Sequence, residues 1–491
     1  MTTIALPRHA GKQFIGGEWV DPADGRLAET IDPATGEVLA EFADGAQADV
    51  DRAVEAARAA FEDPAWREMA PAARAQLLWR VADLVEAHAD ELAALEVADQ
   101  GQPYTLARYV ILPGVAEHFR YYAGWVTKIE GDVLPNSFPL VKVFNYTRRE
   151  PVGVCGLITP WNLPIGMAAW KLAPALACGN TCIVKPAEQT PLTTLRLAEL
   201  MDEAGIPKGV VNVVTGGPEA GRAISHHPGI DKVSFTGSTE VGREIVKASA
   251  GNLKRVTLEL GGQNPVIVLA DADLEAAVEA GLKGALFNTG QACAAYSRFF
   301  VHRSRADEFA ERCARAVEQM RIGPGHDPET VIGPLVSEEH LQKVHGLVRQ
   351  GVEAGADLLT GGEKADGELA AGNFFRPTVL ANVKPDDPTA QNEVFGPVLS
   401  ILPYDDPDEL AALANSTEYG LVASVWTRDV AKAHDLAARV RAGSVYVNMA
   451  NAVDVASSWG GFKSSGWGRE MGKYALELYT EIKSVWVALD A

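Results

Sequence analysis

Cysteine is scarce in this 491-residue sequence, which contains only five of them, far apart along the chain. Five scattered cysteines are too few for a disulfide framework, and an odd number leaves at least one thiol free. A reducing compartment suits such a chain, so we expect a cytoplasmic protein. The cysteines are Cys155, Cys178, Cys182, Cys293 and Cys313.

Long apolar runs and positive charge are also lacking. No uninterrupted apolar stretch approaches the roughly 18 residues of a membrane span, and the N-terminus contains no apolar signal core. Lysine and arginine total 44 against 65 acidic residues, so the net charge of -21 repels phosphate backbones and anionic lipids. We therefore expect neither nucleic acid nor a membrane as a partner, and we expect no bound metal ion.

The sequence otherwise has the composition of an ordinary globular protein, with 47% hydrophobic residues and 46 glycines. A chain of this length is too long for one compact core, so we expect two large domains and a smaller element. The first quarter is rich in alanine. It predicts helices over residues 53–61 and 72–98, where apolar positions recur at helical spacing.

After Pro151 the pattern changes to short β-branched runs that alternate with helical segments. This alternation predicts a parallel, doubly wound sheet, whose ligands lie beyond the carboxyl ends of the strands. We expect its strands over residues 152–159, 181–185, 210–215, 232–236 and 255–260. A second series predicts a second α/β domain, with strands over residues 265–269, 298–302, 395–402, 423–427 and 444–448.

Two further features concern how these units are joined. Gly261 and Gly262 stand between the two series, and the freedom of glycine in φ suits a crossing between domains. Residues 128–149 have the pattern of a long inserted hairpin with many apolar side chains. An exposed apolar hairpin is an aggregation hazard unless it forms an interface, so we expect oligomerisation through it.

Cys293 is the first candidate for chemistry, because glycine and small residues surround it in Gly290-Gln-Ala-Cys-Ala-Ala295. A lone cysteine is more often a small hydrophobic residue of the core than a nucleophile, and the pattern alone leaves both roles open. The other four cysteines lie in apolar strand or helix patterns, and we expect them in the core.

Two polar residues stand at predicted strand ends. Glu259 is costly to bury unless it is paired or neutral. It is either a surface-facing strand residue, as its alternation with Leu258 and Leu260 allows, or a cleft residue whose pKa rises to suit a general base. Asn162, between two prolines that stiffen its loop, is either a turn residue or an amide held to stabilise an oxyanion.

Lys185 follows a predicted strand and precedes Glu188, an arrangement that suits either a ribose contact or a weak surface ion pair. The usual glycine fingerprint of dinucleotide binding is missing. Gly237 and Gly242 have the spacing of a P-loop, but Arg243 stands where a lysine would be needed, which excludes ATP hydrolysis. A strand, a tight turn and a helix N-terminus still suit a pyrophosphate, which backbone N–H groups would bind.

Seven motifs occur together, in order, along nearly the whole chain. They are Pro160-Trp-Asn-Leu-Pro164, Val184-Lys-Pro-Ala-Glu188, Phe235-Thr-Gly-Ser238, Leu258-Glu-Leu-Gly-Gly262, Gly290-Gln-Ala-Cys293, Glu393-Val-Phe-Gly-Pro397 and Lys463-Ser-Ser-Gly-Trp-Gly-Arg-Glu470. In order and wording these motifs resemble the aldehyde dehydrogenase superfamily.

The resemblance implies an α/β fold with a Rossmann-type coenzyme domain, an α/β catalytic domain and a small β oligomerisation element. It implies that residues 1–126 and 149–260 form the NAD-binding domain and residues 261–469 the catalytic domain. Residues 127–148 and 470–491 then form the oligomerisation element of a homodimer or homotetramer.

The resemblance also implies roles for individual residues. Cys293 is the nucleophile, Asn162 and the Cys293 backbone N–H form the oxyanion hole, Glu259 is the base, and Glu470 is a second carboxylate in proton release. The presence of Glu259 implies release of the free acid rather than an acyl-CoA. NAD is the implied cofactor, and NADP is less favoured because a carboxylate at Glu188 repels a 2′-phosphate. The implied cofactor residues are Thr159, Trp161, Lys185, Glu188, Gly237, Ser238, Gly242, Leu260, Glu393 and Phe395.

The implied substrate pocket is apolar and uncharged. We therefore expect oxidation of an uncharged aliphatic or aromatic aldehyde through a thiohemiacetal and a thioester on Cys293, and not of a dicarboxylic semialdehyde, which would need a pocket arginine or lysine. A thiol esterase or hydrolase and a non-catalytic structural relative are the alternatives. A requirement for NAD would distinguish a dehydrogenase from a thiol esterase or hydrolase, which does not need it. A non-catalytic relative would lack at least one of Cys293, Glu259 and Asn162, and all three are present. The implied pocket residues are Leu163, Met167, Trp170, Ala292, Ala294, Val453 and Trp459.

Overall fold

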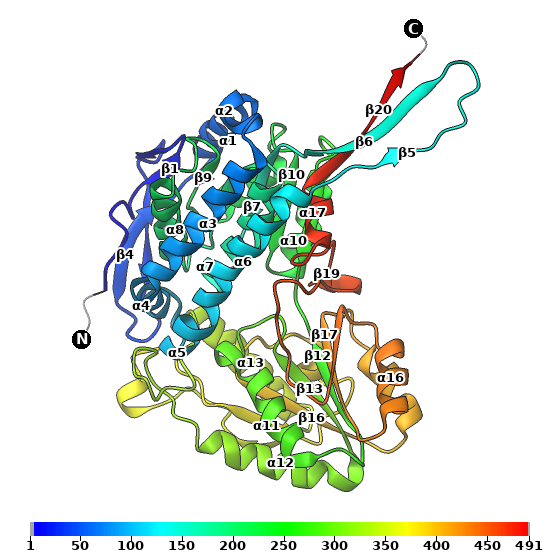
Figure 1. Cartoon of the computed structure of the whole chain (residues 1–491). Helices are drawn as coiled ribbons and strands as arrows, with labels where there is room; N and C mark the ends of the chain where they lie inside the picture. The colour runs from blue at the N-terminus through cyan, green and yellow to red at the C-terminus, as the bar shows by residue number, and fades with distance from the viewer. Residues whose placement is uncertain (1–3, 490–491) are drawn as a thin grey trace.

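The computed structural model of the chain describes residues 4–489. Residues 1–3, which begin the predicted NAD-binding domain, lie outside the described residues. Residues 490–491, which end the predicted oligomerisation element, do so as well. In Figure 1 the N-terminal part of the chain forms the upper half of the molecule, the part coloured yellow and orange lies in the lower half, and a long β arm leaves the upper half. No helix within residues 4–489 is long and apolar enough to cross a membrane.

The upper half is built on an eight-stranded sheet within the described residues. Its central strands run parallel, as the alternating pattern predicts, whereas the two strands at one edge and the strand at the other are antiparallel. In sheet order the strands are β19 (Gly466–Trp467), β11 (Arg255–Glu259), β10 (Lys232–Thr236), β7 (Val154–Ile158), β8 (Thr181–Lys185), β9 (Val211–Val213), β1 (Gln13–Ile15) and β2 (Glu18–Val20).

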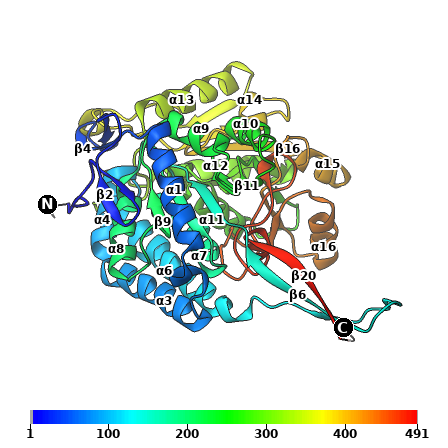
Figure 2. The same ribbon diagram turned by 90° about the horizontal axis from the view of Figure 1, so that it is seen from above.

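Helices cover both faces of this sheet because its central strands carry apolar side chains on both faces. Leu157 and Val184 are buried on one face, and Ile183 and Phe235 are buried on the other. Figure 2 shows α3, α6 and α8 together on one side, and α9 and α10 on the other. The helices of this half are α1 (Gln47–Glu62), α2 (Pro64–Arg67), α3 (Pro71–Ala87), α4 (Ala89–Gln100), α5 (Tyr104–Leu106), α6 (Leu112–Trp125), α7 (Pro164–Ala177), α8 (Leu192–Glu203), α9 (Pro218–His226) and α10 (Thr239–Ser249).

The lower half is built on a seven-stranded sheet that is parallel except at one edge. Phe299 and Phe300 are successive residues of its central strand, and their side chains enter separate cores. In sheet order the strands are β14 (Asp357–Thr360), β15 (Thr378–Ala381), β16 (Val398–Tyr404), β13 (Tyr296–His302), β12 (Asn264–Val268), β17 (Val422–Trp426) and β18 (Ser444–Val447). The helices around it are α11 (Leu274–Ala285), α12 (Arg303–Glu318), α13 (Glu338–Glu353), α14 (Pro388–Gln391), α15 (Leu410–Ala414) and α16 (Val430–Arg439).

The predicted hairpin forms the arm seen in Figure 1. β5 (Val133–Leu134) pairs with β6 (Val143–Pro151), and β6 pairs along its whole length with β20 (Thr480–Ala488). A short helix, α17 (Tyr474–Leu478), precedes β20, and a separate two-stranded sheet joins β3 (Leu27–Ile31) to β4 (Val38–Ala43). β19 belongs to the range predicted for the catalytic domain but pairs with β11 of the first sheet. The domain boundaries themselves stay a prediction.

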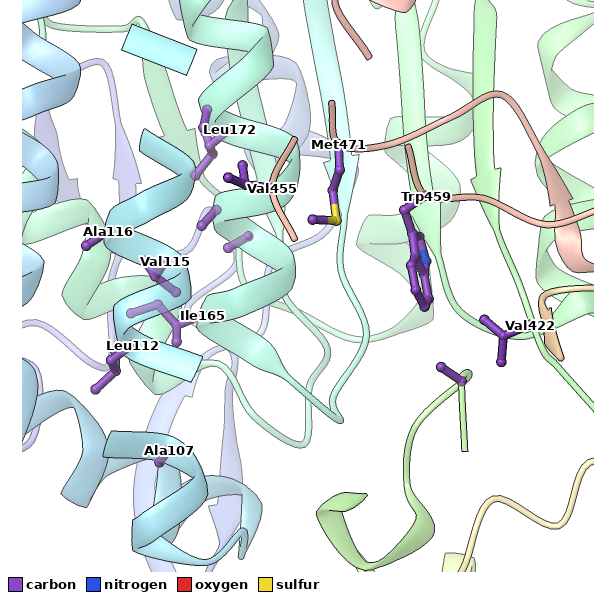
Figure 3. Packing of buried hydrophobic residues seen from close by; sticks show 14 of the residues in the cluster. Ala107, Leu112, Val115, Ala116, Ile165, Leu172, Val422, Val455, Trp459 and Met471 are labelled. Carbon is purple, nitrogen blue, oxygen red and sulfur yellow. The ribbon is translucent and has the colours of Figure 1, made fainter. Parts of the chain in front are cut away.

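One core runs between the two halves. It includes side chains of α6 and α7, residues of the chain between β18 and α17, and the first residue of β17. Figure 3 shows part of it, with Val115 and Leu172 on the helices and Met471, Trp459 and Val422 further toward the second sheet. The two halves therefore share apolar contacts around the region where the predicted site residues lie.

Two expected elements differ in the structure. The predicted helix 72–98 is two helices, α3 and α4, which meet at His88. The predicted strand 395–402 begins only at Val398, because Phe395 has a φ of 57°, a left-handed conformation that a strand does not allow.

The structure gives a different reason from the predicted one for the two glycines between the sheets. Neither Gly261 nor Gly262 has a positive φ, so conformational freedom does not explain them. A Cβ on Gly261 would lie 2.4 Å from the carboxylate of Glu393, and a Cβ on Gly262 would lie 2.3 Å from the carbonyl oxygen of Cys293. These glycines allow the crossing chain to approach the neighbouring loops closely.

Two buried carboxyl groups of α4 hold the first turns of α7 and α8. Glu96 accepts hydrogen bonds from the backbone N–H of Ile165 at 3.0 Å and from the hydroxyl of Thr193 at 2.7 Å. Asp99 accepts one from the backbone N–H of Leu192 at 2.9 Å. Because free N–H groups at a helix start need acceptors, Glu96 fixes where α7 begins and Asp99 fixes where α8 begins.

The Glu96 carboxyl makes stability depend on pH. Burial raises its pKa from 4.5 to about 7, so the folded protein holds this proton more tightly than the unfolded chain. The proton on Glu96 contributes about 3 kcal/mol to the free energy of unfolding. This contribution is fully present below about pH 4.5 and is lost as the pH rises through 7. We expect Glu96→Gln, which cannot titrate, to flatten the decline in stability between pH 5 and 8, measured as urea midpoints at several pH values. Glu62→Gln, at an exposed position, should keep the wild-type slope, and an equal slope in Glu96→Gln would refute this assignment.

Candidate active site

A cavity of about 480 Å³ lies between the carboxyl ends of β10 and β11 and the loop that leads into β13. All the predicted catalytic and substrate-pocket residues line it. The predicted cofactor residues Trp161, Gly237, Ser238, Leu260, Glu393 and Phe395 line it as well. Thr159, Lys185, Glu188 and Gly242 do not, and lie beyond it at the ends of β7 and β8 and on α10.

A larger groove of about 870 Å³ lies on the surface among α5, α11 and α12. It contains none of the predicted site residues. The smaller cavity is therefore the candidate active site.

The loop before Cys293 has a strained backbone. Asn288, Thr289 and Gly290 all have a positive φ, of 49°, 59° and 74°. Such conformations are costly for residues other than glycine and persist only when the surroundings impose them. Here the Thr289 hydroxyl accepts a hydrogen bond from the backbone N–H of Gly333 at 3.0 Å, and a Cβ on Gly290 would lie 2.1 Å from the carbonyl oxygen of Gly396.

Cys293 is partly buried at the cavity wall, whereas the other four cysteines are buried in the core, as predicted. Burial raises the pKa of the Cys293 thiol, and the nearby carboxyls of Glu259 and Glu393 raise it further. The backbone N–H groups of Ala294 and Cys293 act in the opposite direction because they favour the thiolate. The thiol is therefore neutral until a base takes its proton.

Asn162 points its amide toward the cysteine loop. Its Nδ2 donates a hydrogen bond to the backbone carbonyl oxygen of Gln291 at 2.9 Å, and the backbone carbonyl oxygen of Asn162 accepts one from Nδ2 of Asn288 at 2.8 Å. An amide nitrogen carries two hydrogens, so one remains to be donated inside the cavity. Asn162 is thus held by the cysteine loop and is not merely a turn residue.

Glu259 ends β11 with only 3% of its surface exposed, so it faces the cavity and not solvent. Neither of its carboxylate oxygens accepts a well-formed hydrogen bond within the described residues. Burial raises the pKa of Glu259 well above 4.5, and the negative charge of Glu470 adds to this effect. Lys171, Arg469 and Trp459 oppose the shift without cancelling it.

Glu470 lies equally buried but has partners. Its Oε1 forms an ion pair with Lys171 and accepts a hydrogen bond from the Ser234 hydroxyl at 2.9 Å, whereas its Oε2 has no partner in the described part of the chain. Lys171 belongs to α7 and is fully buried. The backbone of Glu470 is fixed by two hydrogen bonds to Trp459, of 2.8 and 2.7 Å.

The other end of the cavity is suited to a dinucleotide. Ser238 caps the N-terminus of α10, and a Cβ on Gly237 would lie 2.5 Å from the ring of Phe235. The hydroxyl oxygens of Thr159 and Thr236 are buried there without a partner in residues 4–489. A helix N-terminus with unpaired hydroxyls beside it is a typical binding site for a pyrophosphate.

The predicted ribose contacts are also built for a polar ligand. Lys185 is buried, donates a hydrogen bond to the carbonyl oxygen of Pro186 at 2.9 Å and lies 3.4 Å from the carboxylate of Glu188. It is therefore not a surface ion pair. Glu393 accepts a hydrogen bond from the backbone N–H of Gly262 at 2.7 Å, and burial raises its pKa to about 7.

Reasoning from the sequence missed several polar residues of the site. Lys171 could have been found as a lone charge in the apolar pattern of residues 164–177. Ser234 and His118 carry no such signal, because a serine in a strand and a histidine in a helix are ordinary. Glu117, His118 and Asn451 also line the cavity, in addition to the apolar pocket residues that were predicted.

Comparison with known proteins places the chain in a family. The profile described as the aldehyde dehydrogenase family matches residues 19–485. The chain belongs to the aldehyde dehydrogenase family. Retinaldehyde dehydrogenase 3 of Rattus norvegicus is 48% identical over 98% of this chain and 93% of its own length, and the mitochondrial aldehyde dehydrogenase of the same species is 47% identical over 96% and 91%.

The fold agrees with this membership. The NAD+ complex of an aldehyde dehydrogenase from Bacillus cereus superposes with a TM-score of 0.95 at 46% identity, covering 99% of this chain and 98% of that one. The family resemblance and the α/β fold expected from the motifs are therefore confirmed. Within residues 4–489 no group of three or more His, Cys, Asp or Glu side chains is arranged to hold a metal ion.

The buried pair of Lys171 and Glu470 gives a stability prediction. We expect Lys171→Met to lower the free energy of unfolding by about 3 to 5 kcal/mol at pH 7, because it leaves a buried carboxylate without its cation. The double variant Lys171→Met, Glu470→Leu should recover part of that loss. Denaturant unfolding measures both variants.

An exposed pair on α10 provides the control. Lys247 and Glu244 lie 2.7 Å apart with most of both side chains in solvent, so Lys247→Met should change stability by less than about 1 kcal/mol. A loss of that small size in Lys171→Met would contradict the importance of the buried pair.

Proposed function

We propose that the protein oxidises an uncharged aliphatic or aromatic aldehyde to the carboxylic acid, with NAD as cofactor and Cys293 as nucleophile. NAD-dependent aldehyde oxidation follows from membership of the family and from the NAD+-bound structural relative. The observation that carries the residue assignments is that Cys293, Asn162 and Glu259 line one cavity, which continues to the N-terminus of α10.

The covalent step is assigned to Cys293 and Asn162. The Cys293 sulfur bonds to the aldehyde carbon as the thiol proton passes to a water molecule in the cavity, and a thiohemiacetal forms. The oxyanion that develops accepts hydrogen bonds from the free N–H of the Asn162 amide and from the backbone N–H of Cys293. Both donors are held in place by the fold, so little reorganisation is needed as the charge develops.

Release of the product is assigned to Glu259. When NAD+ is bound, its nicotinamide ring supplies the acceptor for the hydride that leaves the thiohemiacetal, and a thioester on Cys293 results. Glu259 then takes a proton from a water molecule as that water attacks the thioester carbon. The carbon–sulfur bond breaks, the acid is freed, and Cys293 leaves as a thiolate that regains a proton from solvent. Burial raises the pKa of Glu259 well above 4.5, which makes its carboxylate a stronger base. Glu259 passes the proton taken from water on to Glu470, one oxygen of which forms an ion pair with Lys171.

The residues that would hold NAD are those at the α10 end of the cavity. Gly237, Ser238 and the α10 N-terminus suit the pyrophosphate, and Glu393 and Phe395 suit the ribose and ring of the nicotinamide half. Lys185 and Glu188 suit the adenosine ribose. The Glu188 carboxylate disfavours a 2′-phosphate by charge repulsion, so we propose a preference for NAD over NADP. Trp161 packs against Phe395 with ring centroids 5.3 Å apart, and Thr159, Gly242 and Leu260 complete the predicted set.

The substrate end of the cavity supports an uncharged, bulky aldehyde. Its predicted residues are apolar, with small Ala292 and Ala294 beside the cysteine. The charged side chain at this end, Glu117 of α6, is exposed and acidic. A second carboxylate on the substrate would meet repulsion from Glu117.

The β arm supports a homodimer or homotetramer in the cytoplasm. Many large apolar side chains of the arm are exposed, which suits an interface with a second copy of the chain. All five cysteines are free thiols, which suits a reducing compartment. The exposed apolar residues are Val133, Leu134, Phe138, Leu140, Val141, Phe144, Ile482, Trp486, Val487 and Leu489.

Two variants test the chemical roles. We expect Cys293→Ala to lower the rate of NADH formation by at least about 10³-fold, because it removes the nucleophile. Glu259→Gln should still release a first equivalent of NADH per site but lower the steady-state rate by about 10² to 10⁴-fold, because only acid release needs the base. Stopped-flow absorbance at 340 nm measures both phases.

The controls use a matched cysteine and a matched glutamate. Cys313→Ala, in the core of α12, and Glu244→Gln, on the surface of α10, should keep the wild-type burst and steady rate. Undiminished NADH formation in Cys293→Ala would end the covalent mechanism. Ester cleavage that needs no NAD, without any aldehyde oxidation, would favour a thiol hydrolase instead.

A pair of substrates tests the pocket. We expect benzaldehyde to have a kcat/KM at least about tenfold above that of succinic semialdehyde, because burying an uncompensated carboxylate is costly. Steady-state rates with saturating NAD measure the ratio. A higher kcat/KM for succinic semialdehyde would contradict an apolar substrate.

A further inference from the structure

His118 is a buried polar residue of the cavity that the proposed mechanism does not use. It belongs to α6, and only 4% of its surface is exposed. It lines the cavity from the same end as the predicted substrate residues Trp170 and Trp459. Its place in the fold is therefore the substrate pocket and not the cofactor end.

The hydrogen bonding of its ring fixes the tautomer. The Nδ1 atom lies 2.6 Å from the carbonyl oxygen of Gly114, one turn earlier on α6. A carbonyl oxygen only accepts, so Nδ1 carries the hydrogen. Burial lowers the pKa of His118 to about 4, which keeps the ring neutral at neutral pH. The Nε2 atom is then an acceptor with a lone pair.

This acceptor has no donor in the protein. Nε2 is buried, and no hydrogen-bond partner for it exists within residues 4–489. A buried polar atom without a partner is uncommon, because it has lost its water and gained nothing in return. A phenylalanine would fill the same space without that loss, so the unpaired acceptor points to a ligand.

The surrounding rings hold the acceptor in place. The His118 ring stacks on Trp170 with centroids 5.5 Å apart and planes 18° apart. Trp170 in turn meets the edge of Trp459 at 5.9 Å, the residue seen in Figure 3 on the side of the second sheet. These three rings form an aromatic wall that suits a flat, apolar substrate body.

We propose that Nε2 of His118 accepts a hydrogen bond from a hydroxyl group on the aldehyde, at the end remote from the carbonyl. This inference rests on the proposed function and narrows its substrate class to aldehydes that carry a neutral hydrogen-bond donor. An ether or a methyl group at the same place has no hydrogen to donate and leaves Nε2 unpaired.

The test compares matched substrates. Phenylacetaldehydes with a hydroxyl at the meta or para position are each compared with their O-methyl ether, because the methylene group keeps ring substituents from altering the carbonyl. We expect the wild-type enzyme to favour one hydroxyl compound over its ether by roughly 3- to 10-fold in kcat/KM, the size of one neutral hydrogen bond. His118→Phe should reduce that ratio to about one, whatever its rate with unsubstituted phenylacetaldehyde.

Two further variants complete the test. His118→Gln keeps an acceptor and should restore part of the preference, and His118→Met replaces His118→Phe if the latter does not fold. Tyr121→Phe removes a polar atom from the same helix outside the cavity, so it should keep the full preference.

The possible outcomes separate this inference from the proposed function. NADH formation from phenylacetaldehyde without any preference for a hydroxyl, or a preference that survives in His118→Phe, would overturn the role of His118 alone. Absence of NADH formation with every aldehyde would overturn the proposed function, and this inference with it.

Discussion

No side chain fits between Gly262 and the carbonyl oxygen of Cys293, because a Cβ there would lie 2.3 Å from that oxygen. This contact brings the crossing between the two sheets against the cysteine loop. Asn264, the first residue of β12, reinforces it with hydrogen bonds of 2.8 Å from its amide to the carbonyl oxygens of Cys293 and Ala295. The thiol of one half is thereby held next to Glu259, which ends a strand of the other half. Every part of the proposed chemistry depends on this closeness.

Two buried carboxyl groups of the cavity, those of Glu259 and Glu470, have different surroundings. Glu259 and Glu470 are both almost fully enclosed. Glu470 has an ammonium group and a hydroxyl at one oxygen, whereas Glu259 has no well-formed hydrogen bond within residues 4–489 and its pKa rises. These different environments separate the roles of the two carboxyl groups, since the two side chains are chemically identical. Because both side chains are buried, each of these interactions is stronger than it would be at the surface.

Much of the site was predictable because each functional residue lies in a short segment that ends a strand or starts a helix. The motifs around Asn162, Lys185, Glu259 and Cys293 are local, and their order along the chain is enough to indicate the family. His118 and Lys171 could not be assigned in this way. Their importance comes from partners that the sequence does not place beside them: an aromatic wall for His118, and a carboxylate 299 positions away for Lys171.

The sequence by itself determined the alternation of strands and helices, the parallel sheets, the arm and the identity of the candidate nucleophile. These features depend on apolar periodicity and on motifs a few residues long, which report only on near neighbours in the chain. Tertiary structure alone decided that Glu259 faces the cavity, although its alternation in β11 allowed either side. It also decided that Phe395 lies in a left-handed turn before its strand, and that Gly261 and Gly262 serve close contact. Burial and close approach are properties of distant segments packed together, and so they exist only in the folded chain.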